Sequence, residues 1–104
     1  MSSSRPAAIS ACIIAFNEAD RIGDCLASLD FCDDVVVVDS YSTDRTVEIA
    51  QTMGARVLQR PFDGFRSQKQ FAIEQARHDW VLCLDADERV GETLRASILQ
   101  ARED

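Results

Sequence analysis

The chain has 104 residues, 46% of them hydrophobic, and a net charge of −7 at pH 7. This length suits one domain, and a domain of this size buries about two-thirds of its unfolded surface, so a core forms without disulfides. The acidic charge argues against nucleic acid or an anionic membrane surface as the main partner, because both would repel the chain. No segment has the apolar character of a signal peptide or a membrane span, and the cysteines lack metal-binding spacing. These features favour a cytoplasmic protein with a flexible N-terminus over residues 1–8.

Four apolar runs predict four β-strands, at residues 9–15, 35–38, 56–58 and 80–84. The first, second and fourth runs are continuous rather than alternating, which is typical of strands covered on both faces. Cys12 and Cys83 lie inside two of these runs, so both are expected to be small core residues.

Helical patterns separate the predicted strands. Asn17 is expected to cap the first helix, and Ser42 or Thr43 the second. A third helix is expected over about residues 67–77, and a fourth after Gly91. This alternation predicts an open α/β sheet with helices on both faces, since crossovers between parallel strands are right-handed.

Polar residues follow three of the predicted strands. They are Phe16-Asn17-Glu18, Asp39-Ser40 and Asp85-Ala86-Asp87. The carboxyl ends of strands in an open α/β sheet form the usual ligand site, so these residues are expected to converge on one edge.

The pair Asp85 and Asp87 is the strongest chemical signal. On an extended backbone, residues i and i+2 point to the same face, so the two carboxylates lie close together. They repel each other unless a cation binds between them. Mg²⁺ or Mn²⁺ fits, because both ions prefer oxygen ligands and share them with diphosphates. The alternative is a strand that ends in solvated acids. Lys69 and Arg66 are the nearest basic candidates for a phosphate, although a solvated helix face explains Arg66 as well.

Other chemistries of paired aspartates fit poorly. An EF-hand loop from Asp85 requires glycine where Val90 stands and glutamate where Ala96 stands. A haloacid-dehalogenase-type site requires threonine or valine in place of Arg89. Asp39 is expected either to contact a ligand or to be an acid in a turn. Asn17 is expected either to contact a ligand or to cap a helix.

Three ordered motifs carry a family resemblance: IAFNEADRI, VVVVDSYSTDRTVEIA and GFRSQKQFAIEQARHDWVLCLDADE. Together they resemble the N-terminal portion of family 2 glycosyltransferases with the GT-A fold, over residues 9–90. GFRSQKQFA and DADER most resemble the bacterial subgroup that adds sugars to the lipopolysaccharide core.

The resemblance implies a Rossmann-like sheet with strand order 3-2-1-4 and a site for a nucleoside-diphosphate sugar of the UDP type. Phe16, Asn17 and Glu18 would line the nucleotide pocket. Asp39 would contact uracil or ribose, Lys69 the base and phosphates, Asp85 the ribose, and Asp87 the metal. These assignments rest on the resemblance alone.

The family transfers the sugar with inversion to an acceptor hydroxyl, here a saccharide or lipid-linked acceptor at or near the inner membrane face. The general base of the family lies after the DxD motif, so none is assigned, and residues 9–104 are expected to be the nucleotide-sugar-binding half of a longer enzyme, inactive alone. The alternative is a non-catalytic nucleotide-binding or interaction module. Without later strands, the apolar run from Trp80 to Leu84 would form an open edge through which the chain self-associates.

Overall fold

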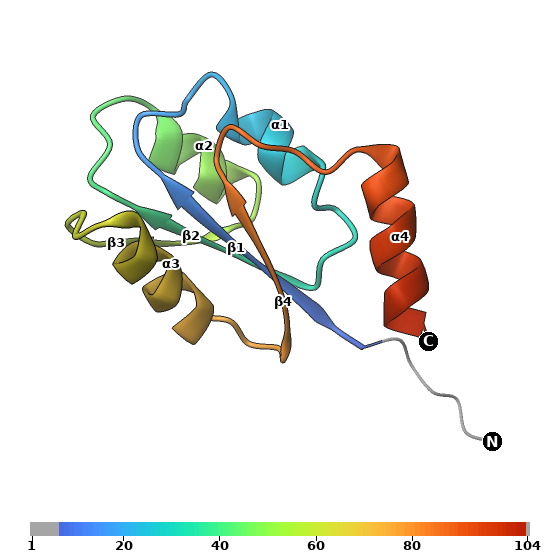
Figure 1. Ribbon diagram of the computed structural model, residues 1–104. Coiled ribbons are helices and arrows are strands. Elements are labelled where there is room, and N and C mark those ends of the chain that lie inside the picture. The colour runs from blue at the N-terminus through green and yellow to red at the C-terminus, as the bar shows by residue number, and fades with distance from the viewer. Residues whose placement is uncertain (1–6, 104) are drawn as a thin grey trace.

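The computed structural model describes residues 7–103. Strands and helices alternate along these residues (Figure 1). The elements are β1 (Ile9–Ala15), α1 (Ile22–Ala27), β2 (Asp34–Asp39), α2 (Thr46–Thr52), β3 (Arg56–Gln59), α3 (Phe65–Glu74), β4 (Trp80–Asp85) and α4 (Glu92–Glu103). Of the predicted flexible N-terminus, residues 1–6 lie outside the described residues. None of the described helices combines the length and the apolar character needed to cross a membrane.

The strands form one sheet of order β3-β2-β1-β4, in which every described pairing is parallel. This confirms the predicted α/β class and strand order. Helices α1 and α2 lie on one face of the sheet and α3 on the other (Figure 1). The carboxyl ends of all four strands consequently meet at one edge, as the ligand-site prediction requires.

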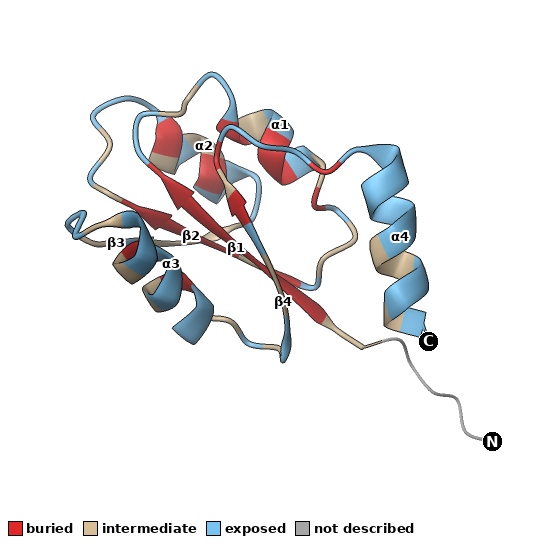
Figure 2. Cartoon of the chain, viewed as in Figure 1, coloured by how far each residue is buried: buried red, intermediate tan, exposed pale blue. Residues whose placement is uncertain are grey.

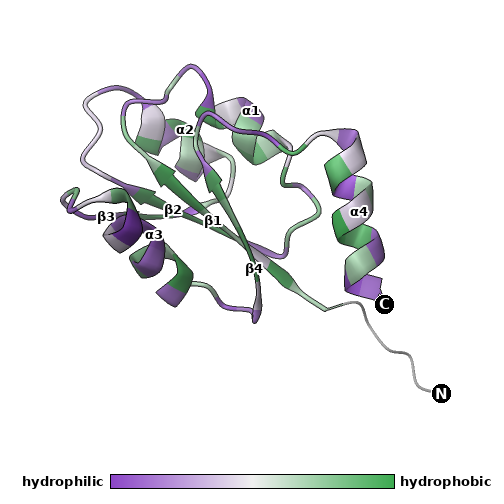
Figure 3. Ribbon diagram, in the orientation of Figure 1, coloured by the Kyte–Doolittle hydropathy of each residue, from purple (hydrophilic) through white to green (hydrophobic). Residues whose placement is uncertain are grey.

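The core is centred on β1 and β2 (Figure 2). Every residue of β1 is buried, and β2 is buried except at Val35. The same two strands are the continuous apolar centre of the fold in Figure 3, because helices cover both of their faces. The prediction of doubly covered strands is therefore confirmed for β1 and β2.

Strand β4 differs, although its sequence is equally apolar. It lies at the edge of the sheet, with Trp80 42% exposed and Cys83 also exposed. The predictions of a covered fourth strand and of a core position for Cys83 are therefore wrong. The reason is that β4 has only β1 beside it, while α4 is mostly exposed and contacts the core through Ile98 (Figure 2). Cys12, in contrast, is buried on β1, and burial raises its pKa to about 12.

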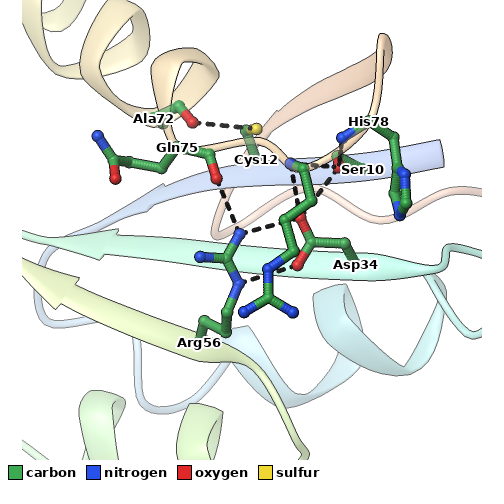
Figure 4. Close-up of polar contacts among 8 residues, drawn as sticks. Ser10, Cys12, Asp34, Arg56, Ala72, Gln75 and His78 are labelled. Atoms are coloured by element: carbon green, nitrogen blue, oxygen red, sulfur yellow. Dashed lines mark hydrogen bonds and ion pairs between the residues drawn. The ribbon is translucent and has the colours of Figure 1, made fainter.

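A partly buried polar network lies at the amino-terminal edge of the sheet (Figure 4). The carboxylate of Asp34 accepts hydrogen bonds from Nε of Arg56 at 2.9 Å and from Oγ of Ser10 at 2.9 Å. The backbone N–H of Arg77 also donates to Asp34 at 3.2 Å, and Arg56 donates from Nη2 to the carbonyl of Gln75 at 2.8 Å. This network joins β1, β2 and β3 to the end of α3.

Candidate functional site

A hollow of about 360 Å³ lies at the carboxyl edge of the sheet. Its lining comes from the ends of β1, β2 and β4, the loop before α3 and the start of α3. It consists of Ile14, Ala15, Phe16, Glu18, Ser40, Phe62, Phe65, Gln68, Asp85, Ala86 and Asp87. The predicted convergence of the polar strand ends is thus confirmed. Four of the seven predicted site residues, Phe16, Glu18, Asp85 and Asp87, line this hollow.

The loops that follow β1 and β2 are tied to each other. Asn17 adopts a left-handed conformation with φ of 51°, and its side-chain oxygen accepts a hydrogen bond from the backbone N–H of Thr43 at 2.8 Å. The hydroxyl of Ser42 in turn accepts from the backbone N–H of Asn17 at 2.8 Å. The predicted capping roles of these residues are wrong, because α1 begins at Ile22 and α2 at Thr46. Their side chains instead fix the two loops together and so hold the edge of the site.

Asp39 belongs to this scaffold rather than to the lining of the hollow. It is fully buried, and its carboxylate accepts hydrogen bonds from the hydroxyl and the backbone N–H of Ser42, at 2.5 and 2.8 Å, and from the amide of Gln59 at 3.3 Å. Asn17 and Lys69 also lie outside the lining. Lys69 approaches it indirectly, with its Nζ atom 4.0 Å from Oδ1 of Asp85.

The DxD motif spans the end of β4 and the start of a turn. The strand ends at Asp85, and the backbone N–H of the buried Ala86 donates to the carbonyl of Ile14 at 3.1 Å. Asp87 then lies in the turn, so the extended backbone expected across both acids ends before it. Both residues nevertheless line the hollow, on either side of the anchored Ala86.

Two oxygens in this lining are shielded from solvent and find no hydrogen-bond partner among the described residues. They are Oε2 of Glu18 and Oδ1 of Asp85. The other oxygen of Glu18 accepts from Arg21 at 2.7 Å. Shielded carboxylate oxygens without partners are costly unless a cation or a donor joins them, so the donor set fits a hard divalent ion.

The protein ligands present are few. Within residues 7–103 no three or more histidine, cysteine, aspartate or glutamate side chains come together in a way that could hold a metal ion. An ion at Asp87 would therefore take most of its oxygens from a second molecule, as Mg²⁺ does when it binds substrate phosphates. This chemistry suits a diphosphate.

The sequence interpretation missed three polar or aromatic lining residues. They are Phe62, Phe65 and Gln68. A signal for two of them was present, since Phe62 and Phe65 flank a turn-forming Asp63-Gly64 pair where loops are usually polar. Gln68 gave no such signal, because a glutamine on a helix is normally solvated, whereas here it is fully buried.

Comparison with known families decides the assignment of the chain. Residues 10–100 match the family described as glycosyl transferase family 2. The chain belongs to glycosyltransferase family 2. The resemblance of its three motifs is thereby confirmed, as is the GT-A fold that the resemblance implied.

Curated relatives in this family extend well beyond the chain. It is 46% identical over 91 residues to an uncharacterised glycosyltransferase of Rickettsia bellii, covering 86% of this chain and 31% of that protein. It is 41% identical over 92 residues to the lipopolysaccharide core biosynthesis glycosyltransferase LpsC of Rhizobium meliloti, covering 84% of this chain and 34% of that protein. The chain therefore spans about a third of the length of these relatives.

Several solved structures share the fold. S. aureus TarS superposes with a TM-score of 0.74 at 29% identity, over 92% of this chain and 20% of TarS. Glucosyl-3-phosphoglycerate synthase from Mycobacterium tuberculosis superposes with a TM-score of 0.62 at 29% identity, over 80% of this chain and 36% of the synthase. The latter structure is a complex with Mn²⁺, uridine diphosphate and glucosyl-3-phosphoglycerate.

Proposed function

We propose that this chain is the donor-binding part of a metal-assisted, inverting glycosyltransferase that uses a nucleoside-diphosphate sugar of the UDP type. The acceptor is a hydroxyl of a saccharide or lipid-linked saccharide. Family membership and the synthase complex with Mn²⁺ and uridine diphosphate support this proposal. The similarity to LpsC supports a role in lipopolysaccharide core synthesis. We propose that this synthesis takes place at the cytoplasmic face of the inner membrane.

The observation that carries the proposal is the hollow with two shielded carboxylate oxygens that accept no hydrogen bond from the described residues. Phe16 and Glu18 provide one wall of a nucleotide pocket at the end of β1, and Asp85 and Asp87 provide the acidic wall at the end of β4. In this arrangement Asp87 would hold the metal and Asp85 would approach the ribose. A bound divalent ion neutralises the charge that grows on the departing diphosphate.

The remaining assigned residues act at the rim of the hollow. Lys69 lies close enough to Asp85 to bring positive charge to the phosphates, and the buried Asp39 keeps the loop after β2 in position for the base. Asn17 fixes the loop after β1 against that loop. A carboxylate that takes the proton from the acceptor hydroxyl belongs to the complete reaction, and no residue of this chain is assigned to it.

Thermal unfolding with uridine diphosphate or guanosine diphosphate, with and without Mn²⁺, tests the proposal. A ligand at a hundred times its Kd adds roughly 2.7 kcal/mol to the free energy of unfolding. We expect uridine diphosphate to stabilise the chain more in the presence of Mn²⁺, and Asp87→Asn to remove the metal-dependent part. Asp79→Asn is the matched control, because it removes the same charge from an exposed site at the opposite end of β4.

Each outcome has a distinct meaning. If the Asp87→Asn variant responds to Mn²⁺ as the parent does, the metal assignment is wrong. If the nucleotide binds and Mn²⁺ has no influence, the alternative of a non-catalytic nucleotide-binding module is favoured. If neither nucleotide stabilises the chain, the donor-site proposal fails.

We also propose that a second copy of the chain covers the exposed side of β4. This edge strand is uncharged from Trp80 to Leu84, so two such edges approach without the repulsion that the net charge of −7 creates elsewhere. An apolar hollow of about 290 Å³ beside it is lined by residues that include Ile9, Trp80 and Ile98. Light scattering at increasing concentration should show dimers that Trp80→Glu removes, and a strictly monomeric parent at high concentration would contradict this.

A further inference from the structure

Three consecutive backbone N–H groups in the loop after β1 donate to side chains at or before the start of α2. The first belongs to Asn17 and is described above. The N–H of Glu18 donates to Oγ1 of Thr46 at 2.9 Å, and the N–H of Ala19 donates to Oδ2 of Asp44 at 3.1 Å. The acceptors of these two bonds lie 28 and 25 positions further along the chain, so the contacts exist only in the folded protein.

The side chains of Asp44 and Thr46 are bonded to each other. The hydroxyl of Thr46 donates to Oδ1 of Asp44, and the backbone N–H of Thr46 donates to the same oxygen at 3.0 Å. Because the hydroxyl proton is directed at Asp44, the hydroxyl oxygen can accept the N–H of Glu18. The pair therefore holds the peptide groups that precede and follow Glu18.

Glu18 is also fixed through its other polar atoms. Its carbonyl accepts hydrogen bonds from the N–H groups of Arg21 and Ile22, at 3.0 and 2.8 Å. Its Oε1 atom accepts from Nη2 of Arg21 at 2.7 Å. The remaining oxygen, Oε2, is shielded and accepts no hydrogen bond from the described residues. Of the polar atoms of Glu18, only Oε2 is thus left for a ligand in the hollow that Glu18 lines.

The loop around Glu18 needs support from outside itself. Asn17, directly before Glu18, has a φ of 51°, a left-handed conformation that residues other than glycine adopt rarely. Such a conformation persists where the surrounding structure holds it in place. Neither Asp44 nor Thr46 lines the hollow, so any influence of this pair on a ligand there passes through the loop that it holds.

We propose that Asp44 and Thr46 are positioning residues for the carboxylate of Glu18. By holding both peptide groups of Glu18, they keep its side chain in the wall of the hollow before the nucleoside diphosphate arrives. This inference rests on the proposed function and adds two residues that influence donor affinity without touching the donor. A side chain that is held in advance loses less conformational freedom on binding, so release of the loop should weaken affinity.

Calorimetric titration of uridine diphosphate with Mn²⁺ tests this inference. Thr46→Val replaces the hydroxyl by a methyl group of similar size and should weaken binding by about tenfold, the effect of one lost hydrogen bond. Thr46→Ser keeps the hydroxyl and should bind within about twofold of the parent. Thr52→Val is the matched control, because it makes the same change at an exposed residue of α2, and it should leave binding unchanged.

A double-mutant cycle separates positioning of Glu18 from a general structural role. Glu18→Ala should itself weaken binding of the nucleotide. Because the carboxylate is then absent, adding Thr46→Val to Glu18→Ala should weaken binding no further. Asp44→Ala is the second variant, since Asp44 is exposed and its substitution leaves the buried Thr46 in place if Thr46→Val fails to fold. It should show the same absence of a further effect in the Glu18→Ala background.

The result that overturns this inference differs from the one that overturns the proposed function. If the parent binds uridine diphosphate and Thr46→Val and Asp44→Ala bind it equally well, the pair does not position the site, while the donor site stands. If Thr46→Ser binds as weakly as Thr46→Val, or if Thr46→Val weakens Glu18→Ala as much as it weakens the parent, the pair does not act through Glu18 and the inference is wrong. If the parent does not bind uridine diphosphate, the proposed function fails, and this inference fails with it.

Discussion

The two ends of the sheet use similar residues in opposite ways. At the amino-terminal edge, both oxygens of Asp34 accept hydrogen bonds, and the backbone N–H groups of Arg77 and His78 donate to the hydroxyl of Ser10 at 3.1 Å each (Figure 4). At the carboxyl edge, one shielded oxygen of Glu18 and one of Asp85 have no hydrogen-bond partner among residues 7–103. An acid next to a buried strand is therefore not by itself a sign of function. The sign is a shielded carboxylate oxygen to which no described residue donates a hydrogen bond.

The largest loss of stability should come from a substitution in the hydrogen-bond network at the amino-terminal edge of the sheet. Asp34→Ala leaves the guanidinium of Arg56 and the N–H of Arg77 without their acceptor in a partly buried site, which should lower the free energy of unfolding by about 2 kcal/mol. Urea denaturation measures the loss. Asp20→Ala is the control, because Asp20 is exposed, and it should stay within about 0.5 kcal/mol of the parent. A loss below about 1 kcal/mol for Asp34→Ala would contradict the structural role of the network.

The same network should make stability depend on acid pH. Burial raises the pKa of Asp34, but the hydrogen bonds from Arg56, Ser10 and the backbone of Arg77 outweigh burial and hold that pKa below its ordinary value of 3.8. A carboxylate with a lowered pKa stabilises the folded state above the ordinary value, and this contribution is lost as the pH falls through the folded-state pKa. Urea unfolding from pH 7 to pH 3 should therefore show the stability difference between the parent and Asp34→Asn shrinking below 3.8. A constant difference would contradict this sign.

The smallest change in stability should come from a substitution of Asp85 at the carboxyl edge of the sheet. Asp85→Asn removes a charge whose nearest cation, Nζ of Lys69, lies 4.0 Å away, and whose shielded oxygen has no hydrogen bond among residues 7–103. We expect the free energy of unfolding to change by less than about 0.5 kcal/mol, while stabilisation by uridine diphosphate with Mn²⁺ falls. If Asp85→Asn destabilised the chain as strongly as Asp34→Ala, the proposed difference between the two edges of the sheet would be wrong.

Periodicity and composition predicted most of the architecture, because each strand and helix must bury its own apolar residues. The alternation of strands and helices could be read from single runs such as 9–15, and the edge that collects polar strand ends follows from parallel topology alone. The first residues of the helices were harder to predict from the sequence. The residues expected to cap α1 and α2, Asn17 and Ser42, bind the opposite loop instead, and a contact of this kind between residues 25 positions apart leaves no local signal.

The amino-acid sequence by itself determined the α/β class, the strand order through its family motifs, and the position of Phe16, Glu18, Asp85 and Asp87 at one edge. Only the tertiary structure decided that Asp39 is buried as a loop support, that Cys83 is exposed, and that Phe62 and Phe65 form a pair in the hollow. The physical reason is that covalent neighbours and hydrophobic spacing fix what each segment becomes. Exposure and hydrogen-bond partnership depend on which distant segments lie beside it.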